Sequence, residues 1–396
     1  MNNLISSFKT KGLTLSLGLS LILAGCGGDS SSSNDLTITT RVGIIATASD
    51  DYASGEVELA AIEESNITAS GGYFSGISDI AVNGYGQNYY LLRKFWADQV
   101  LKVNVENPAA EVWQASALNR GETGSANPYQ LIFVDETKAY LLRYDQDTAW
   151  IVDPSATQAS EFFKGNTLDL SNYVPADSNG APGMSSGVVV DGKLFITLQR
   201  LDGNFQPTNE SYVAVFDTAT DAEIETNADE NDNLKGIPLI GQNPGGIQHL
   251  EGTGVIVHNI GSYSTTNGTS LDLVDPATYT VTSMIGDAEI DTQISDAVIV
   301  SSTKGYILNY ASFQSISLQS FDPSQGASSL TTVGSFSNAD FRDIELSPEG
   351  RLWLADARVN NPGIRVINTS DDTEADFVET SLLPIDISFA EINDTF

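Results

Sequence analysis

Serine and histidine side chains in the middle of the chain have spacings that could support nucleophilic or metal chemistry. Residues 183–187 (GMSSG) match the pattern G-x-S-x-G, in which a strand-to-helix turn exposes a serine hydroxyl for attack on an acyl group. Here the pattern leads into the apolar run 188–190, which is typical of a strand, so we expect a structural serine. His249 and His258 are the only two histidines, too few for a three-histidine metal centre.

The acidic segment 229–233 (DENDN) offers oxygen ligands of the kind that calcium prefers. Asp229, Asn231 and Asn233 are the candidate ligands, and calcium is the candidate cofactor. However, Leu234 occupies the position at which a helix–loop–helix calcium site needs glycine, and no helical pattern flanks the segment. An acidic surface loop is the alternative interpretation.

The charge of the chain restricts its partners. It has 52 acidic and 18 basic residues and a net charge of −34. Such a surface repels phosphate backbones, so we expect no nucleic-acid partner. High solubility is one interpretation of this charge, and attraction of cations or of a basic partner is the other.

The single cysteine, Cys26, ends the segment LAGC at 23–26, which follows two lysines and an apolar run too short to span a membrane. This segment resembles a bacterial lipobox, in which the cysteine is lipidated and becomes the mature N-terminus. The resemblance implies a signal peptide at 1–25 and a lipid-anchored Gly/Ser tether at 26–39. We expect a single folded domain at 40–396, for the reasons given below. Gly27 stands where an aspartate would resemble an inner-membrane retention signal, which favours an outer-membrane lipoprotein of the cell envelope, facing either the periplasm or the exterior.

From residue 40 onward, apolar runs of strand length alternate with turn residues, and helical periodicity is almost missing. One pattern of strand, tight turn, strand, variable loop, strand and Asp or Asn turn repeats six times. The repeats are roughly 50 residues apart, the length of a four-stranded propeller blade. The predicted first and second strands are 77–82 with 89–92, 129–134 with 139–142, 187–190 with 194–198, 246–250 with 254–257, 297–300 with 305–308, and 343–346 with 352–355.

A seventh unit is divided between the two ends of the chain. Residues 383–390 alternate like a first strand, while 42–46 and 56–62 look like second and third strands without a first. Joining them would close the ring and remove exposed strand edges. We therefore predict an all-β propeller of seven four-stranded blades, one closed by N- and C-terminal strands, with six or eight blades as alternatives.

The strand ending VDPAT at 274–278 and the phrases ANPY at 126–129 and NPGGI at 243–247 resemble the repeats of YVTN-type β-propellers. The resemblance covers roughly residues 40–390, although Ser295 and Asp296 stand where one blade would have its Asn-Pro. Members of this wider group include surface lipoproteins that capture ligands, nucleic-acid binders and lactonase-like enzymes. The architecture alone therefore does not select an activity.

In a propeller, the loops after each second strand surround the mouth of the central channel. Arginine recurs at this position, and aromatic residues follow it. Arginine forks suit carboxylates and other anionic groups, and aromatic faces suit planar ligands. The alternative is that these are ordinary strand-end residues paired with neighbouring acids such as Asp145 and Asp356. The candidate ligand-binding residues are Arg93, Trp96, Arg143, Tyr144, Arg200, Phe205, His258, Tyr263, Tyr310 and Arg358.

These features favour a non-enzymatic role: a lipid-anchored propeller that binds a small ligand or a membrane partner protein. The family resemblance implies a receptor or another envelope protein as partner, as in outer-membrane nutrient uptake. A calcium-dependent lactonase or other hydrolase is the alternative, because Asp79, Asp296, Asp343 and Asp386 start inner strands and could point into the channel. A scaffold in an envelope complex is the third hypothesis.

Overall fold

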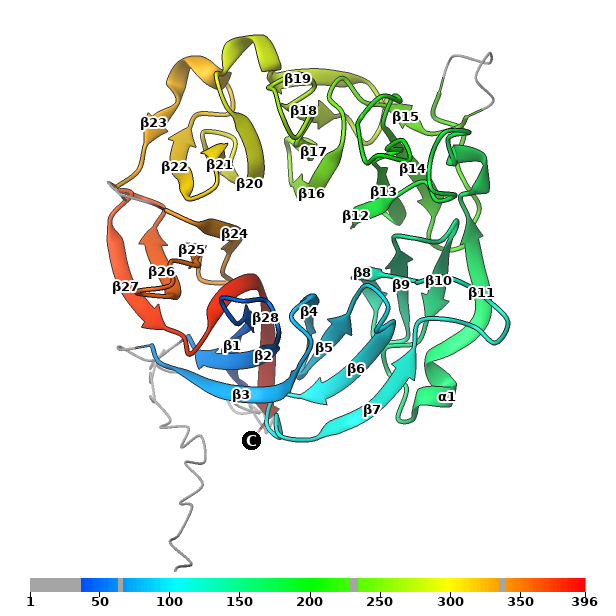
Figure 1. Cartoon of the computed structure of the whole chain (residues 1–396), viewed down its shortest axis with the longest axis vertical. Coiled ribbons are helices and arrows are strands. Elements are labelled where there is room, and N and C mark those ends of the chain that lie inside the picture. The colour runs from blue at the N-terminus through cyan, green and yellow to red at the C-terminus, as the bar shows by residue number, and fades with distance from the viewer. Residues whose placement is uncertain (1–36, 63–66, 228–233, 335–338, 396) are drawn as a thin grey trace, which may run out of the picture.

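The structure is a computed structural model of the chain, and it describes residues 37–62, 67–227, 234–334 and 339–395. Seven four-stranded antiparallel sheets stand around a central channel as the blades of a ring (Figure 1). The chain is a seven-bladed β-propeller, which confirms the predicted fold class. The described residues contain no helix long and apolar enough to cross a membrane.

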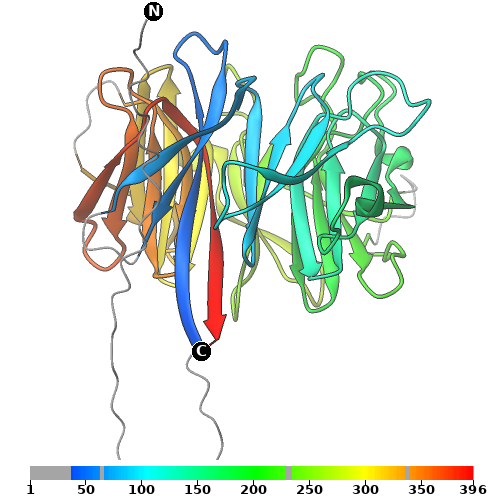
Figure 2. The same cartoon turned by 90° about the horizontal axis from the view of Figure 1, so that it is seen from below.

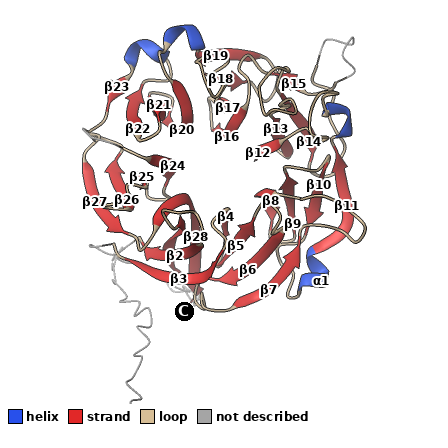
Figure 3. Cartoon of the chain, in the orientation of Figure 1, coloured by secondary structure: helices blue, strands red, loops and turns tan. Residues whose placement is uncertain are grey.

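Each of the first six blades uses consecutive strands, from the channel outward (Figure 3). Blades 1 to 3 consist of β4 (Ile80–Tyr85), β5 (Asn88–Arg93), β6 (Gln99–Asn104) and β7 (Glu111–Ser116); β8 (Pro128–Asp135), β9 (Lys138–Arg143), β10 (Thr148–Val152) and β11 (Phe163–Asp169); and β12 (Met184–Val190), β13 (Lys193–Leu198), β14 (Tyr212–Asp217) and β15 (Ile237–Pro238). Blades 4 to 6 consist of β16 (Pro244–Leu250), β17 (Gly254–Asn259), β18 (Ser270–Val274) and β19 (Val281–Ile285); β20 (Gln293–Ser301), β21 (Lys304–Ser312), β22 (Ser315–Phe321) and β23 (Thr331–Thr332); and β24 (Phe341–Leu346), β25 (Arg351–Asp356), β26 (Gly363–Asn368) and β27 (Glu374–Glu379). The only described helices are α1 (Ala159–Phe162), η1 (Ser171–Tyr173), η2 (Asp287–Glu289) and η3 (Gly326–Ser329).

The seventh blade closes the ring by pairing the two ends of the chain. The C-terminal strand β28 (Leu383–Thr395) is innermost, followed by β1 (Thr37–Ala48), β2 (Gly55–Ala61) and β3 (Ala69–Gly76). β1 and β28 pair antiparallel from Thr37 opposite Thr395 to Ala48 opposite Leu383. This is the predicted closure, although β1 begins at Thr37, before the predicted strand 42–46 and before the predicted domain start at 40. The predicted signal peptide and Cys26 lie outside the described residues.

Apolar side chains between neighbouring blades form the core. Ile44 and Val57 of blade 7 pack with Val82, Tyr89 and Leu101 of blade 1, and similar clusters lie between the other blades. Each fully buried side chain of this kind contributes about 1.5–3 kcal/mol. Since the chain has a single cysteine and cannot form an intramolecular disulfide, these interfaces and the ring closure hold the fold together.

Turn chemistry separates the strands as the sequence indicates. Asp191 and Gly192 both have positive φ, which a two-residue type I′ hairpin requires. At the end of the third strand of blade 4, the Asp275 carboxylate accepts hydrogen bonds from the backbone N–H groups of Ala277 and Thr278. The repeated aspartate therefore caps its turn, as predicted from the repeat.

The ring has two distinct faces. We call the upper face the one that carries the loops between second and third strands and the loops that lead into each inner strand. The lower face carries the first-to-second hairpins, the start of β1 at Thr37 and the end of β28 at Thr395. In Figure 2 the long strands β1 and β28 run to this lower end, where the C-terminus is marked. The described chain therefore begins on the face opposite the second-to-third strand loops.

Candidate functional site

The central channel is a cavity of about 630 Å³. All seven inner strands contribute to its wall, because each presents alternate side chains to the axis. The polar lining is unevenly distributed around the ring. Blades 5, 6 and 7 supply carboxyl groups, while blades 1, 2 and 4 supply carboxamides.

Three inner-strand aspartates tie neighbouring blades together. Asp296 on β20 accepts a hydrogen bond from the Ile344 N–H (3.0 Å). In the same way, Asp343 on β24 accepts from Ile387 N–H (2.7 Å), and Asp386 on β28 accepts from Val82 N–H (2.6 Å). Each carboxylate thus satisfies a backbone donor of the next inner strand, in addition to lining the channel.

Carboxamides make the same connection elsewhere in the ring. Asn83 accepts from Leu131 N–H (2.9 Å), Gln130 from Gly187 N–H (2.8 Å) and Gln248 from Ile299 N–H (2.8 Å). Because a neutral amide performs this structural task, the task does not require a carboxyl group. The charge on blades 5, 6 and 7 is therefore available for another purpose.

Enclosure in the channel raises the pKa values of these acids. Removal from bulk water, together with the charges of Asp386, Asp296 and Glu345, holds the pKa of Asp343 well above its usual value. Enclosure raises the pKa of Glu345 to about 8 and that of Asp386 to about 7, with the nearby Asp296 charge adding to both. Glu345 and Asp386 can therefore exchange protons near neutral pH, and their ionised forms would suit a cation.

His258 on β17 lies beside this cluster. Its Nδ1 is 3.8 Å from Asp296 Oδ1, and its buried Nε2 has no hydrogen-bond partner among the described residues. Burial lowers the pKa of His258, although the Asp296 charge opposes this shift. Two glycines make room for the ring: a Cβ at Gly245 would lie 2.3 Å from Nε2, and one at Gly246 would be 2.8 Å from the imidazole.

At the upper mouth, Tyr129 and Lys94 line the channel, and Tyr144 stacks on Tyr129 from outside the lining. The rings of Tyr129 and Tyr144 stack with centroids 4.5 Å apart, and Lys94 Nζ lies 4.0 Å from the centroid of Tyr129. Lys94 also lies 3.5 Å from the Asp79 carboxylate, which is at the rim and not among the channel-lining residues. Tyr144 donates a hydrogen bond to Gln199.

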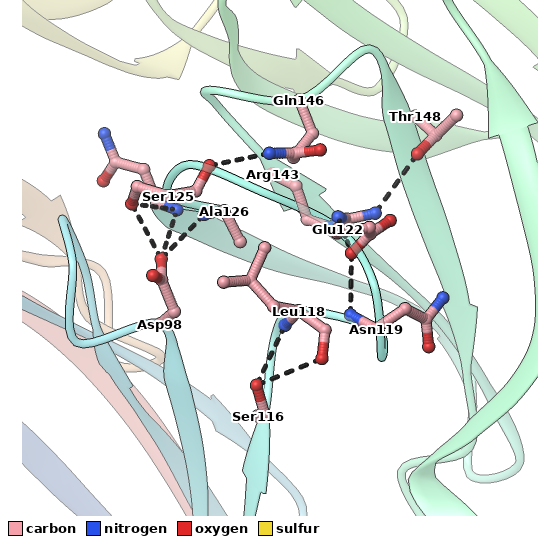
Figure 4. Close-up of polar contacts among 11 residues, drawn as sticks. Asp98, Ser116, Leu118, Asn119, Glu122, Ser125, Ala126, Arg143, Gln146 and Thr148 are labelled. Carbon is pink, nitrogen blue, oxygen red and sulfur yellow. Dashed lines mark hydrogen bonds and ion pairs between the residues drawn. The ribbon is translucent and has the colours of Figure 1, made fainter.

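The candidate arginines have structural partners. The side chain of Arg143 is fully buried: it pairs with Glu122 (2.7 Å), donates to Thr148 and stacks 4.4 Å from the Trp150 ring (Figure 4). Figure 4 also shows Asp98 accepting hydrogen bonds from Ser125 and Ala126, which anchors the loop that carries Glu122.

The other three arginines are engaged in a similar way. Arg358 forms an ion pair with Asp356 (2.6 Å), the acid considered from the sequence. Arg200 donates to the carbonyls of Tyr173 and Glu210, and Arg93 donates to Gln99 and to the carbonyl of Phe74. None of the four is a channel-lining residue, and their role in binding an anion stays a prediction.

The remaining sequence candidates separate into three groups. Trp96, Phe205 and Tyr263 are exposed on upper-face loops, while Tyr310 is half-buried at the end of β21. Ser185 of the G-x-S-x-G segment donates to the Pro244 carbonyl and bonds Thr197, so its hydroxyl connects strands. Asp229, Asn231 and Asn233 lie outside the described residues; within the described ones, no three His, Cys, Asp or Glu side chains are arranged to hold a metal ion.

The sequence-based analysis did not identify Lys94 and Glu345 as part of the site. Glu345 lies two positions after Asp343 on β24, so strand alternation places both side chains on the channel side. That period of two was a usable signal. Lys94 follows β5 in a loop, and no sequence pattern indicates that its side chain reaches Tyr129.

Comparisons with known proteins support the architecture. No protein-family profile and no curated protein matches the chain. Apo AztD from Citrobacter koseri superimposes with a TM-score of 0.50 at 13% identity, over 89% of this chain and 99% of that one. A Bacteroides fragilis protein with a provisional assignment as a 6-phosphogluconolactonase superimposes with a TM-score of 0.57 at 11% identity, over 91% of this chain and 99% of that one. A protein from Lactobacillus plantarum also has a TM-score of 0.57, at 13% identity, over 89% of this chain and 99% of that one. At these identities the likeness shows the propeller fold alone.

Proposed function

We propose that the protein is a lipid-anchored binding protein of the cell envelope that holds a small, positively charged ligand in its propeller channel. The carboxyl cluster formed by Asp296, Asp343, Glu345 and Asp386 is the observation that carries this proposal. Since carboxamides serve as the inter-blade ties elsewhere, the carboxyl groups add charge that the fold does not need. When the cluster loses its protons, its carboxylates repel one another. A bound cation would offset that repulsion.

The chemistry of the channel favours a cationic ligand over the anionic one suggested by the arginines. Those arginines are paired or buried, whereas the acids line the cavity. Lys94 and the tyrosine pair at the mouth would contact a polar or planar part of the same ligand. A cavity of about 630 Å³ is within the range typical of small-molecule sites.

The location is part of the proposal. The lipobox-like segment at 23–26 supports a lipid anchor at Cys26, and Gly27 supports the outer membrane. Ten residues lie between Cys26 and Thr37, so eleven residue-to-residue steps of roughly 3.5 Å would place the lower face within about 40 Å of the lipid. The YVTN-type repeat phrases support the assignment to that wider group of propellers.

Anchoring is tested by labelling cells with radioactive palmitate. We expect label on the wild-type protein and none on Cys26→Ser, which should leave the membrane fraction. A Cys26→Ser variant that stays labelled would contradict the anchor.

Ligand binding is tested by native mass spectrometry of the protein extracted from its own membrane in a mild detergent. We expect a small cationic molecule on the wild-type protein and its loss from Asp343→Asn/Glu345→Gln. The matched control is Asp275→Asn, which removes one acid from a turn outside the channel. A wild-type protein without any bound molecule, or equal retention by the channel variant, would overturn the proposal.

A further inference from the structure

Large apolar side chains are exposed almost entirely on the upper face. Among the described residues with such exposure, only Val112 lies elsewhere, on the outer strand β7. Trp96 and Phe313 are each 66% exposed. The upper-face set, which we call the apolar rim, comes from the loops of blades 1 and 3 to 7 and consists of Tyr52, Ile77, Phe95, Trp96, Phe205, Ile240, Tyr263, Phe313 and Val359.

The loops of the apolar rim hold several aromatic residues in an unfavourable backbone conformation. Tyr52, Trp96 and Phe205 have φ of 55°, 62° and 59°, in the left-handed region that bulky residues rarely adopt. Glycine or asparagine would adopt this conformation more easily. Fold stability therefore does not explain why aromatic side chains occupy these positions.

Hydrogen bonds hold two of these loops in place. Trp96 N–H donates to Ser125 Oγ (3.0 Å), and the Phe95 and Trp96 rings contact each other edge to face. Asp202 accepts from the N–H groups of Asn204 and Gln206, on either side of Phe205. A preformed aromatic surface binds a partner with a smaller loss of conformational entropy, and such side chains are frequent interface hot spots.

The surroundings of the apolar rim are acidic. On the same face, Lys94 pairs with the Asp79 carboxylate and Arg358 with that of Asp356, while Arg200 donates to the Glu210 backbone carbonyl. Further carboxylates surround these groups. These further acids occupy the upper-face loops that carry or adjoin the rim residues, at Asp50, Asp51, Asp202, Asp287, Glu289 and Asp291.

The acidic charge and the position of β1 on the lower face limit which molecules could bind the apolar rim. A second copy of the chain would bring the same negative surface, and an anionic lipid surface would also be repelled. In addition, β1 begins at Thr37 on the lower face, so the apolar rim is on the opposite side of the ring from the start of the described chain. A positively charged protein surface complements both the acids and the aromatic faces.

We propose that the apolar rim docks a partner protein that presents Lys or Arg side chains together with apolar ones. Cationic side chains lie over the exposed aromatic rings and pair with the adjacent carboxylates, while apolar groups cover the rest of the rim. This surface is separate from the channel carboxyls, so the proposal goes beyond the small-ligand function. An experiment can support or refute either proposal without affecting the other.

The experiment is photo-crosslinking in cells that produce the full-length protein. A benzoylphenylalanine is placed at Trp96 or Phe205, or at Val112 as the matched control. We expect the two rim positions to crosslink to the same protein, with a basic contact surface, and Val112 not to crosslink to it. Adducts only with lipid, only with a second copy, with an acidic protein or with nothing would overturn the proposal.

The identified partner is then purified and titrated against the full-length protein in detergent. We expect Trp96→Gly/Phe205→Gly to weaken binding at least tenfold while its melting temperature stays equal or rises, because glycine relieves the positive φ. Raising the salt concentration should weaken wild-type binding, and Val112→Ala should leave it unchanged. Affinity unaffected by the double substitution or by salt would refute the docking surface.

Discussion

Replacing Asp386 by asparagine should make the protein more stable, and increasingly so as the pH rises. The enclosed carboxyl has a pKa raised from 3.8 to about 7, so the folded state binds its proton more tightly than the unfolded state does. Its contribution to stability is therefore complete below pH 3.8 and is lost as pH rises towards 7. Asparagine can still accept the hydrogen bond from Val82 N–H, but it carries no charge to repel Asp343.

The size of the effect follows from the pKa change. Each pKa unit is worth about 1.4 kcal/mol, so a rise from 3.8 to about 7 corresponds to about 4 kcal/mol at most, because channel water screens part of it. The assay is urea unfolding of Asp386→Asn and wild type at pH 5 and pH 8. Asp386→Ala, which removes the acceptor as well, should be less stable than the asparagine variant at both pH values. A stabilisation by Asp386→Asn that is equal at the two pH values, or larger at pH 5, would refute the reasoning.

Three further substitutions test the packing around the site. Asp356→Ala leaves Arg358 and Arg365 without their shared buried carboxylate and should lower the free energy of unfolding by about 3–5 kcal/mol, measured in urea; a loss below about 1 kcal/mol would contradict the structure. Gly245→Ala puts a Cβ 2.3 Å from His258 Nε2 and should lower the melting temperature, whereas the same change in a His258→Ala background should be tolerated. Gly84→Ala places a Cβ 1.9 Å from the Phe389 carbonyl oxygen and should destabilise the contact between blades 7 and 1 by about 3 kcal/mol. For the last variant, unchanged thermal unfolding would show that the two strands are farther apart.

Much of the architecture was predictable from the residues because it depends on local chemistry. The Asp191-Gly192 turn, the Asp275 cap and the period-two alternation of the inner strands all act within one hairpin. The closure by residues 383–390 was predictable for a different reason: the first N-terminal unit lacked an inner strand, and a ring must have none of its edges exposed. The start of β1 at Thr37 was not predicted, because the threonines at its beginning continue the polar composition of the predicted tether.

The candidate site was less predictable, since its interactions join distant parts of the chain. Arg143 occupies the repeated strand-end position, yet its side chain turns under the loop to Glu122 instead of facing the mouth. The recurrence of arginine indicated a position on the strand, but the direction of a long side chain depends on the carboxylate that it meets. His258 occupies the equivalent place and does line the channel, because Gly245 and Gly246 leave space for it.

The sequence by itself determined the repeat, the ring closure, the acidic character and the expectation of a lipid anchor at Cys26. Each of these depends on short segments of the sequence or on its overall composition. The sequence also suggested that Asp296, Asp343 and Asp386 could point into the channel. Only the tertiary structure decided that they do so together with Glu345 and without Asp79, and that the exposed aromatic residues share the face opposite Thr37. The physical reason is that a closed ring converts seven separate strand positions into one wall, so that charges far apart in the chain share a single enclosed space.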